Sequence, residues 1–166
     1  DGLHLSPDGN TLYFVTHSPN HTNMGYIYPV SLPGFEVNSP LYIPDTNDPY
    51  ADLQSIEFSN NGTIAYIGVM SGVSSEETAP TLLKYTNLAG TLSYIGSVDI
   101  PNAERLWSME SLPTSPIPTL WLSVSSKLIV VDSNNPENII QNIDEGLGRS
   151  PSTCTSPDGR TMVVTG

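Results

Sequence analysis

The chain has 166 residues, of which 37% are hydrophobic and 13% charged, a composition that excludes a highly charged disordered chain. Seventeen acidic and five basic residues give a formal net charge of −12 and a pI near 4.2, which argues against binding to nucleic acid or to an anionic membrane surface. The longest apolar runs, such as 128–131, have the length of a strand and not of a membrane span. We therefore predict no nucleic-acid partner and no membrane insertion.

Three segments of the chain repeat one pattern, in which a short strand, a tight turn and a second strand follow one another. In chain order they are 3–16, 56–68 and 153–165, and their turns contain Asp8-Gly9, Asn61-Gly62 and Asp158-Gly159. Asp-Gly and Asn-Gly are strong signals for a β-hairpin, because glycine adopts a positive φ without a Cβ clash. The second turn follows the first by about 50 residues and the third follows after about twice that distance, which predicts a further unit between them.

That further unit is predicted at 106–124, where two strand-like segments flank a longer, proline-rich turn. Two more strands follow the hairpin in each unit; they are predicted at 25–31, 39–43, 81–86, 92–98, 127–132 and 137–143. No segment shows the apolar spacing of a helix, and four strands per unit are typical of β-propeller blades. We therefore predict an all-β fold of antiparallel four-stranded blades at about 1–58, 54–105, 106–148 and 149–166, the last of them incomplete.

The turn in Leu5-Ser-Pro-Asp-Gly-Asn-Thr-Leu-Tyr-Phe14 is similar to the repeats of TolB-like and YVTN-type β-propellers. The resemblance covers nearly the whole chain and implies the fold. These groups include scaffolds, periplasmic binding modules, peptidase-associated propellers and lactonases, so the function has to be argued from sites. The Trp-Asp dipeptide of WD-type blades is missing from this sequence.

About three blades and the start of a fourth cannot form a closed ring, since propellers usually have four to eight blades. Open blades leave strand edges and apolar faces exposed, which natural proteins avoid. We therefore expect further protein at the open blade edges. It is either the chain's own continuation, which we prefer, or identical copies of the chain.

The sequence contains no catalytic motif, and we assign no residue a catalytic or cofactor-binding role. His17 and His21 are separated by Pro19, which argues against a helical metal-binding pair, so we interpret them as loop residues. His4 is interpreted as an ordinary strand residue. Cys154, the only cysteine, is interpreted as a small buried strand residue.

The acidic segment 45–52 contains four side chains with oxygen atoms that a calcium ion could use. They are Asp45, Asn47, Asp48 and Asp52. The segment lacks the glycine and the distal glutamate of an EF-hand loop. We interpret it as a solvated connection between blades, with calcium binding as the alternative and no other cofactor expected.

Asn20 and Asn61 each begin an Asn-x-Thr tripeptide, which is the acceptor signal for N-linked glycans. Asn20 is preferred because it lies in a polar loop broken by Pro19, whereas Asn61 lies in a tight turn. Few lysines, high acidity and many Ser and Thr residues accompany these signals. Together they favour a glycosylated extracellular or cell-surface protein.

These observations leave three functions open. The preferred hypothesis is a non-enzymatic extracellular β-propeller segment that acts as a structural or adhesive module of a larger glycoprotein or fibre. The first alternative is a lactonase-like hydrolase with a metal in the axial channel, for which inner strands must present about three protein ligands. The second alternative is an intracellular protein-interaction scaffold.

Overall fold

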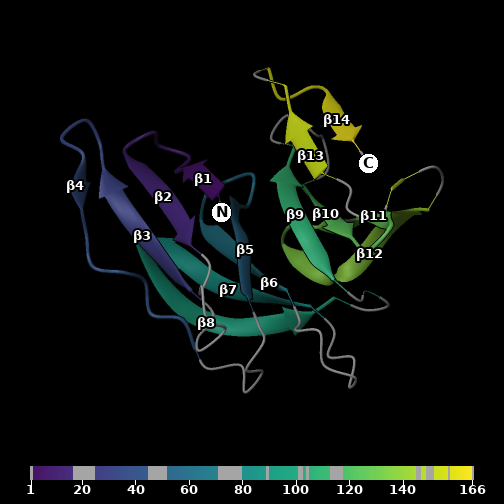
Figure 1. Ribbon diagram of the computed structural model, residues 1–166, viewed down its shortest axis with the longest axis horizontal. Helices are drawn as coiled ribbons and strands as arrows, with labels where there is room; N and C mark the ends of the chain where they lie inside the picture. The colour runs from purple at the N-terminus through teal and green to yellow at the C-terminus, as the bar shows by residue number, and fades with distance from the viewer. Residues whose placement is uncertain are drawn as a thin grey trace.

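A computed structural model describes residues 2–16, 25–44, 52–70, 80–88, 90–100, 103, 105–112, 118–144, 147–148, 152–156 and 158–165. These residues form fourteen β-strands in four antiparallel sheets (Figure 1). The described parts of the chain contain no helix with the length and hydropathy that crossing a membrane requires. The predicted all-β fold class is confirmed.

Each sheet is a meander whose strands pair in chain order. The first sheet contains β1 (Gly2–Leu5), β2 (Thr11–Thr16), β3 (Tyr26–Ser31) and β4 (Glu36–Val37). The second contains β5 (Asp52–Phe58), β6 (Ile64–Met70), β7 (Thr81–Leu88) and β8 (Thr91–Asp99). The third contains β9 (Leu106–Ser111), β10 (Thr119–Val124), β11 (Lys127–Asp132) and β12 (Asn135–Ile143). The fourth contains two strands among the described residues, β13 (Ser152–Thr155) and β14 (Met162–Thr165).

The hairpin turns that open the first, second and fourth sheets share one set of hydrogen bonds. In the first, the Ser6 Oγ donates to Asp8 Oδ1 at 2.6 Å and accepts the N–H of Thr11 at 2.9 Å. The same contacts join Ser59 with Asn61 and Ile64, and Ser156 with Asp158 and Thr161. The turn glycines Gly9, Gly62 and Gly159 have φ values of 72°, 68° and 65°, which only glycine adopts at little cost. The three turns are therefore structurally equivalent.

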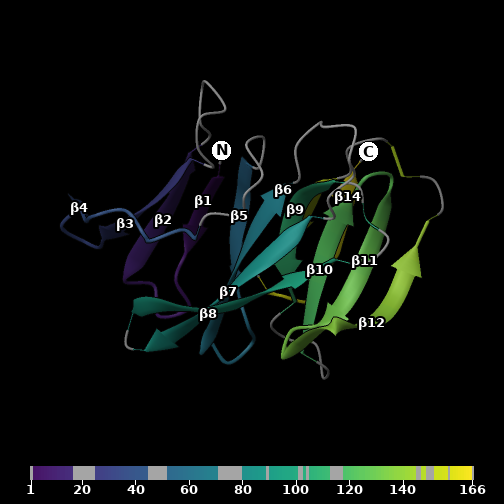
Figure 2. The same ribbon diagram turned by 90° about the horizontal axis from the view of Figure 1, so that it is seen from below.

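Neighbouring sheets pack face to face, because strand alternation gives each sheet apolar faces to bury. One core cluster lies between the first and second sheets and includes Tyr13, Val15, Ile56 and Phe58. A second cluster lies between the second and third sheets and includes Tyr66, Leu82, Leu106 and Leu120. Seen from below, the first three sheets follow one another across the molecule, as blades do (Figure 2).

The predicted strand at 39–43 is wrong, because the fourth strand of the first sheet is β4 at Glu36–Val37. Pro40 has no N–H to donate to a ladder, and the chain beyond β4 keeps only separate backbone bonds to β3. Asn38 N–H donates to Pro29 O, and Leu41 N–H donates to Ile27 O. Leu41 still packs against the first core cluster, so the apolar character of this segment is used without a regular strand.

Candidate functional site

The first strands of the four sheets, β1, β5, β9 and β13, lie next to one another in chain order. β5 contacts β1 and β9, and β9 contacts β13 (Figure 1). In a β-propeller the blades surround a central channel, so these strands occupy the central position of the fold. We call them the inner row.

One register position of the inner row carries a titratable side chain in every sheet. The four residues are His4, Glu57, Glu110 and Cys154. Their antiparallel partners are Tyr13, Tyr66, Trp121 and Val163. The first three partners are each the third residue of the second strand in their sheet. His4, Glu57 and Cys154 also precede the serine of their hairpin turn by two residues.

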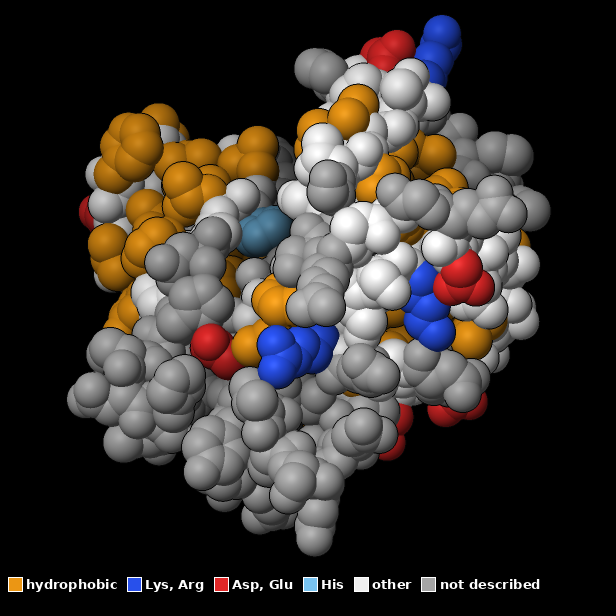
Figure 3. Space-filling model, turned by 45° about the vertical axis from the view of Figure 1, so that its right-hand side comes forward, with side chains coloured by type: hydrophobic (Ala, Val, Ile, Leu, Met, Phe, Trp, Pro, Cys, Tyr) orange, Lys and Arg blue, Asp and Glu red, His pale blue; other side chains and the backbone are white. Residues whose placement is uncertain are grey.

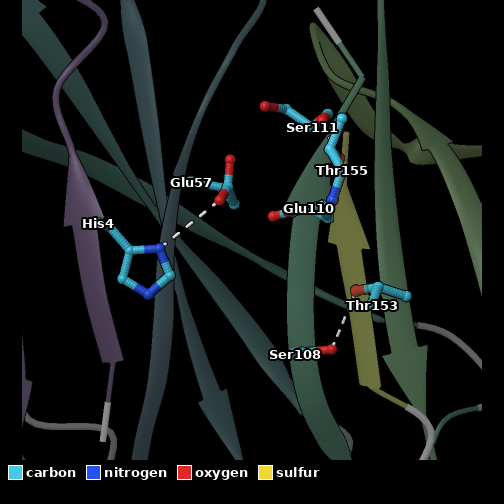
Figure 4. Close-up of polar contacts among 7 residues, drawn as sticks. All are labelled: His4, Glu57, Ser108, Glu110, Ser111, Thr153 and Thr155. Atoms are coloured by element: carbon cyan, nitrogen blue, oxygen red, sulfur yellow. Dashed lines mark hydrogen bonds and ion pairs between the residues drawn. The ribbon is translucent and has the colours of Figure 1, made fainter. Parts of the chain in front are cut away.

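Three of these side chains form a row across the first three sheets (Figure 4). His4 Nδ1 lies 3.6 Å from Glu57 Oε1, and the two side chains are 20% and 14% exposed. Glu57 on β5 and Glu110 on β9 extend into the space between their strands (Figure 4). Glu110 Oε1 accepts the backbone N–H of Thr155 on β13 at 2.8 Å, so the row connects all four sheets.

The environment of Glu110 favours its protonated form. Burial, and after it the nearby charge of Glu57, raise the pKa of Glu110 to about 7, while the hydrogen bond from the Thr155 N–H acts in the opposite direction. Two adjacent carboxyl groups cannot both ionise at low cost in a partly buried setting. Glu110 therefore keeps its proton up to about neutral pH.

The β13–β14 hairpin is attached to β9 mainly by polar contacts. The Thr155 Oγ1 donates to the carbonyl of Ser111 at 3.1 Å, and the hydroxyls of Ser108 and Thr153 lie 3.1 Å apart (Figure 4). Neither core cluster of the described residues includes a side chain of β13 or β14. The hairpin is therefore held by polar contacts with β9, such as the one to Glu110, whereas the first three sheets are held together by apolar clusters.

Most of the sequence-predicted loop sites lie outside the described residues. These are His17, Asn20, His21, Asp45, Asn47 and Asp48. Asp52, predicted as the end of a solvated loop, is instead the buried first residue of β5. Within the described ranges, no three His, Cys, Asp or Glu side chains gather closely enough to hold a metal ion.

Asn61 is exposed and its side chain takes part in the second hairpin turn. Its Oδ1 accepts hydrogen bonds from the Ser59 hydroxyl at 2.9 Å and from the Thr63 N–H at 3.1 Å. The corresponding atoms of Asp8 and Asp158 do the same in their turns. The side-chain oxygen of Asn61 therefore has a structural role, and glycan attachment at this residue stays a prediction.

Cys154 is exposed, so its prediction as a buried residue is wrong. Alternation along β13 directs Thr153 and Thr155 toward β9 and Cys154 to the opposite face. No described segment covers that face. The repeat does place Cys154 at the same register position as His4 and Glu57.

Sequence reasoning gave Glu57 and Glu110 no role and interpreted His4 as an ordinary strand residue. The repeat itself contained a signal for His4 and Glu57, because both stand two residues before a turn serine. Glu110 lacks this signal, since the turn after β9 is proline-rich and has no Ser-x-x-Gly. Its equivalence follows only from its pairing with Trp121.

Comparison with known proteins gives a fold and no family. No protein-family model and no curated protein matches the sequence. Among solved structures, the chain is similar to a hydrazine synthase from Kuenenia stuttgartiensis, with a TM-score of 0.67 and 16% identity. It is also similar to a functionally unknown protein from Desulfotomaculum acetoxidans (TM-score 0.66, 20% identity) and to a putative 6-phosphogluconolactonase from Bacteroides uniformis (TM-score 0.63, 16% identity).

Each likeness covers 98% of this chain, but 57%, 47% and 46% of the three other chains, respectively. The chain thus spans about half the length of the structures that it resembles. At these identities the likeness shows the fold alone. Together with the open four-stranded sheets, it defines the chain as part of a β-propeller.

Proposed function

We propose that this chain is a non-enzymatic β-propeller segment, with its four sheets as successive blades, that acts as a structural or adhesive module. In this proposal, further protein covers its two open faces, either as the chain's own continuation or as identical copies. We also propose that its repeats are related to those of TolB-like and YVTN-type β-propellers. The observation that carries it is the apolar outer face of the first sheet.

The outer face of the first sheet is apolar over its whole width. Alternation directs Tyr13 and Val15 into the core, so their strand neighbours point outward. Leu3, Leu5 and Val37 are 64%, 55% and 68% exposed, and Phe14 is exposed beside them. Figure 3 shows hydrophobic side chains gathered over the first sheet, at the left of the view.

Such a face resembles the inner faces that the other sheets bury against one another. Full burial of a leucine or phenylalanine side chain contributes about 1.5–3 kcal/mol, so covering this face strongly favours association. Large exposed apolar patches on soluble proteins mark contact sites. A sheet face of blade size fits another blade.

The other open face belongs to the β13–β14 sheet. It exposes Cys154 and Val163, and the described part of this sheet has two strands where each of the other sheets has four. In those sheets a third strand pairs antiparallel with the second. An additional strand from further protein would satisfy the edge of β14 in the same way.

The extracellular setting is supported by the acidic composition and by the two Asn-x-Thr tripeptides at Asn20 and Asn61. We expect a glycan at Asn20 and, less readily, at Asn61. Mass spectrometry of the peptide that contains Asn20, from natively secreted material, tests this part. An unmodified Asn20 in such material would contradict the glycoprotein proposal.

The two alternatives make different demands. A metal-dependent, lactonase-like hydrolase requires several ligands that converge on the axis, and the described part of the inner row brings together Glu57 and Glu110 with His4 beside them but no metal-binding group of three. An intracellular scaffold would carry unmodified asparagines and a reduced Cys154. The open apolar face of the first sheet supports the structural module.

The test is to produce residues 1–166 alone and to measure their association by sedimentation velocity and their thermal unfolding. We expect self-association or a broad, weakly cooperative transition. Leu5→Ser should reduce the association, whereas Ile140→Ser on β12, an exposed apolar residue of another sheet, should not. A monodisperse, cooperatively unfolding monomer would contradict the proposal.

A further inference from the structure

The outer strands of the first three sheets each have one edge that pairs with no described strand. They are β4, β8 and β12, the last strands of their sheets, and they lie on the outside of the molecule, away from the inner row (Figure 1). A free edge exposes backbone N–H and C=O groups that can pair with a strand of another molecule. β4 has only two residues, whereas β8 and β12 have nine each, so the long edges belong to the second and third sheets.

The outer strand of the second sheet contains a β-bulge. Lys84 of β7 pairs with Gly96 of β8. The next residue of β7, Tyr85, pairs with Tyr94, so Ile95 is left without a partner in β7. One extra residue on one strand is the defining feature of a bulge. The ladder of the second sheet is therefore interrupted in the middle of its outer strand.

The outer strand of the third sheet contains a bulge of the same kind. Val130 of β11 pairs with Gln141 of β12. The next residue, Val131, pairs with Ile139, so Ile140 is the extra residue on β12. In both sheets the inserted residue is thus an isoleucine on the strand with the free edge.

The two bulges occupy the same register position. The partners of the inner-row glutamates on the second strands are Tyr66 and Trp121. These two residues pair in turn with Lys84 and Val130, which are the residues at which the two bulges begin. An irregularity that recurs at one position of two sheets, in segments of different sequence, is a feature of the repeat and not an accident of one strand.

The packing of the inserted side chains does not explain their presence. Ile95 and Ile140 are 51% and 43% exposed and belong to neither core cluster of the described residues. Other protection of the long edges is sparse. The only charged side chains are Asp99, at the end of β8, and Glu137 of β12, which also contains Pro136 near its start. The bulges are therefore the main features that distinguish these edges from regular apolar strands.

We propose that the two bulges close the outer edges of the second and third sheets to strand addition. A bulge bends its strand and increases the local twist. The backbone groups on the two sides of Ile95, or of Ile140, then cannot meet one straight incoming strand in a single register. The bulges thereby direct contacts with other proteins away from the outer strands. This inference concerns edges that the proposed function does not use, and it does not rest on that function.

The test is to delete Ile95 from the natively produced protein, which keeps the pairs on both sides of the bulge and makes β8 regular. We expect thioflavin T-positive aggregates to form at least about tenfold faster than in the wild type, because a regular apolar edge is a template for another strand. Ile95→Ser keeps the bulge without the apolar side chain and should aggregate no faster than the wild type. Ser97→Lys, added to the deletion variant, places a charge on the edge and should restore the wild-type rate.

An aggregation rate that the deletion leaves unchanged would overturn the proposal, and so would an Ile95→Ser variant that aggregates as fast as the deletion variant. Gly68→Ala controls for aggregation through lost stability, since its Cβ would crowd Leu106 without changing β8. A deletion variant that aggregates no faster than Gly68→Ala would also contradict the proposal. If deletion of Ile95 prevents folding, deletion of Ile140 serves instead. Failure of both variants to fold would show that the bulges are needed for the fold itself and would overturn their role at the edge.

Discussion

Gly9 and Gly62 occupy the same position in two equivalent turns, but their surroundings differ. Both have a left-handed backbone, with φ of 72° and 68°. A Cβ at Gly9 would meet nothing within 4 Å, whereas a Cβ at Gly62 would lie 3.1 Å from the side chain of Pro7 in the neighbouring turn. The second turn is therefore also a contact between the first two sheets.

This difference predicts that a glycine-to-alanine substitution lowers the free energy of unfolding by different amounts at Gly9 and Gly62. Gly9→Ala should lower the free energy of unfolding by about 1–2 kcal/mol, the usual cost of a left-handed alanine. Gly62→Ala should cost about 1 kcal/mol more, because it adds crowding against Pro7. Chemical denaturation of the native protein measures both values. Equal costs would show that the contact with Pro7 contributes nothing.

The roles of the turn residues could be predicted from the sequence, whereas the proximity of Glu57 and Glu110 could not. Ser59, Asn61 and Gly62 act through bonds within six residues, so a local motif is enough to predict them. Glu57 and Glu110 meet only because β5 and β9 are neighbours in space. The turn that would have marked Glu110 as the equivalent of Glu57 is replaced by a proline-rich segment.

Among the elements, β6 shows how closely two sheets approach. Gly68 lies in β6, and a Cβ there would come within 2.5 Å of Leu106 Cδ2 and 3.2 Å of the Met109 side chain. Both contacts belong to the cluster between the second and third sheets. The strand needs a glycine at this point so that the third sheet can pack against it.

Gly68→Ala should therefore destabilise the protein by about 1–3 kcal/mol through overpacking. Gly34→Ala is the matched control, since the nearest atom to a Cβ at Gly34 is 3.8 Å away, and it should change the stability by less than about 0.5 kcal/mol. Thermal unfolding of the two variants decides the matter. A Gly68→Ala variant as stable as the control would contradict the packing described for β6 and β9.

Most strands were predictable because alternation and turn residues are local signals. The predicted strands at 81–86 and 127–132 are found in β7 and β11. The strand predicted at 39–43 failed because its apolar residues were counted without the effect of Pro40 on the ladder. Apolar residues beside an edge strand can pack against a core without forming a regular strand, as Leu41 does.

The whole molecule has two outer faces that no described segment covers, one on the first sheet and one on the β13–β14 sheet. The first sheet exposes an apolar face of the kind that the second and third sheets bury, and the β13–β14 sheet exposes Cys154 and Val163. Sequence reasoning predicted open blades from the count of repeats. The residues that make up the open faces could be identified only from the structure, because they are the residues of each strand that point away from the core.

Cys154 gives the most direct measurement, since it is the only cysteine of the chain and lies exposed on one of the two open faces. The rate of its alkylation by iodoacetamide should be compared in the natively produced protein, in residues 1–166 alone and in the unfolded chain. If further protein covers this face, the native rate should be at least about tenfold lower than that of the unfolded chain, and residues 1–166 alone should react equally slowly only if copies of the chain cover the face. An equally fast reaction in all three samples would show that the face is open to solvent in the native protein and would contradict the central claim.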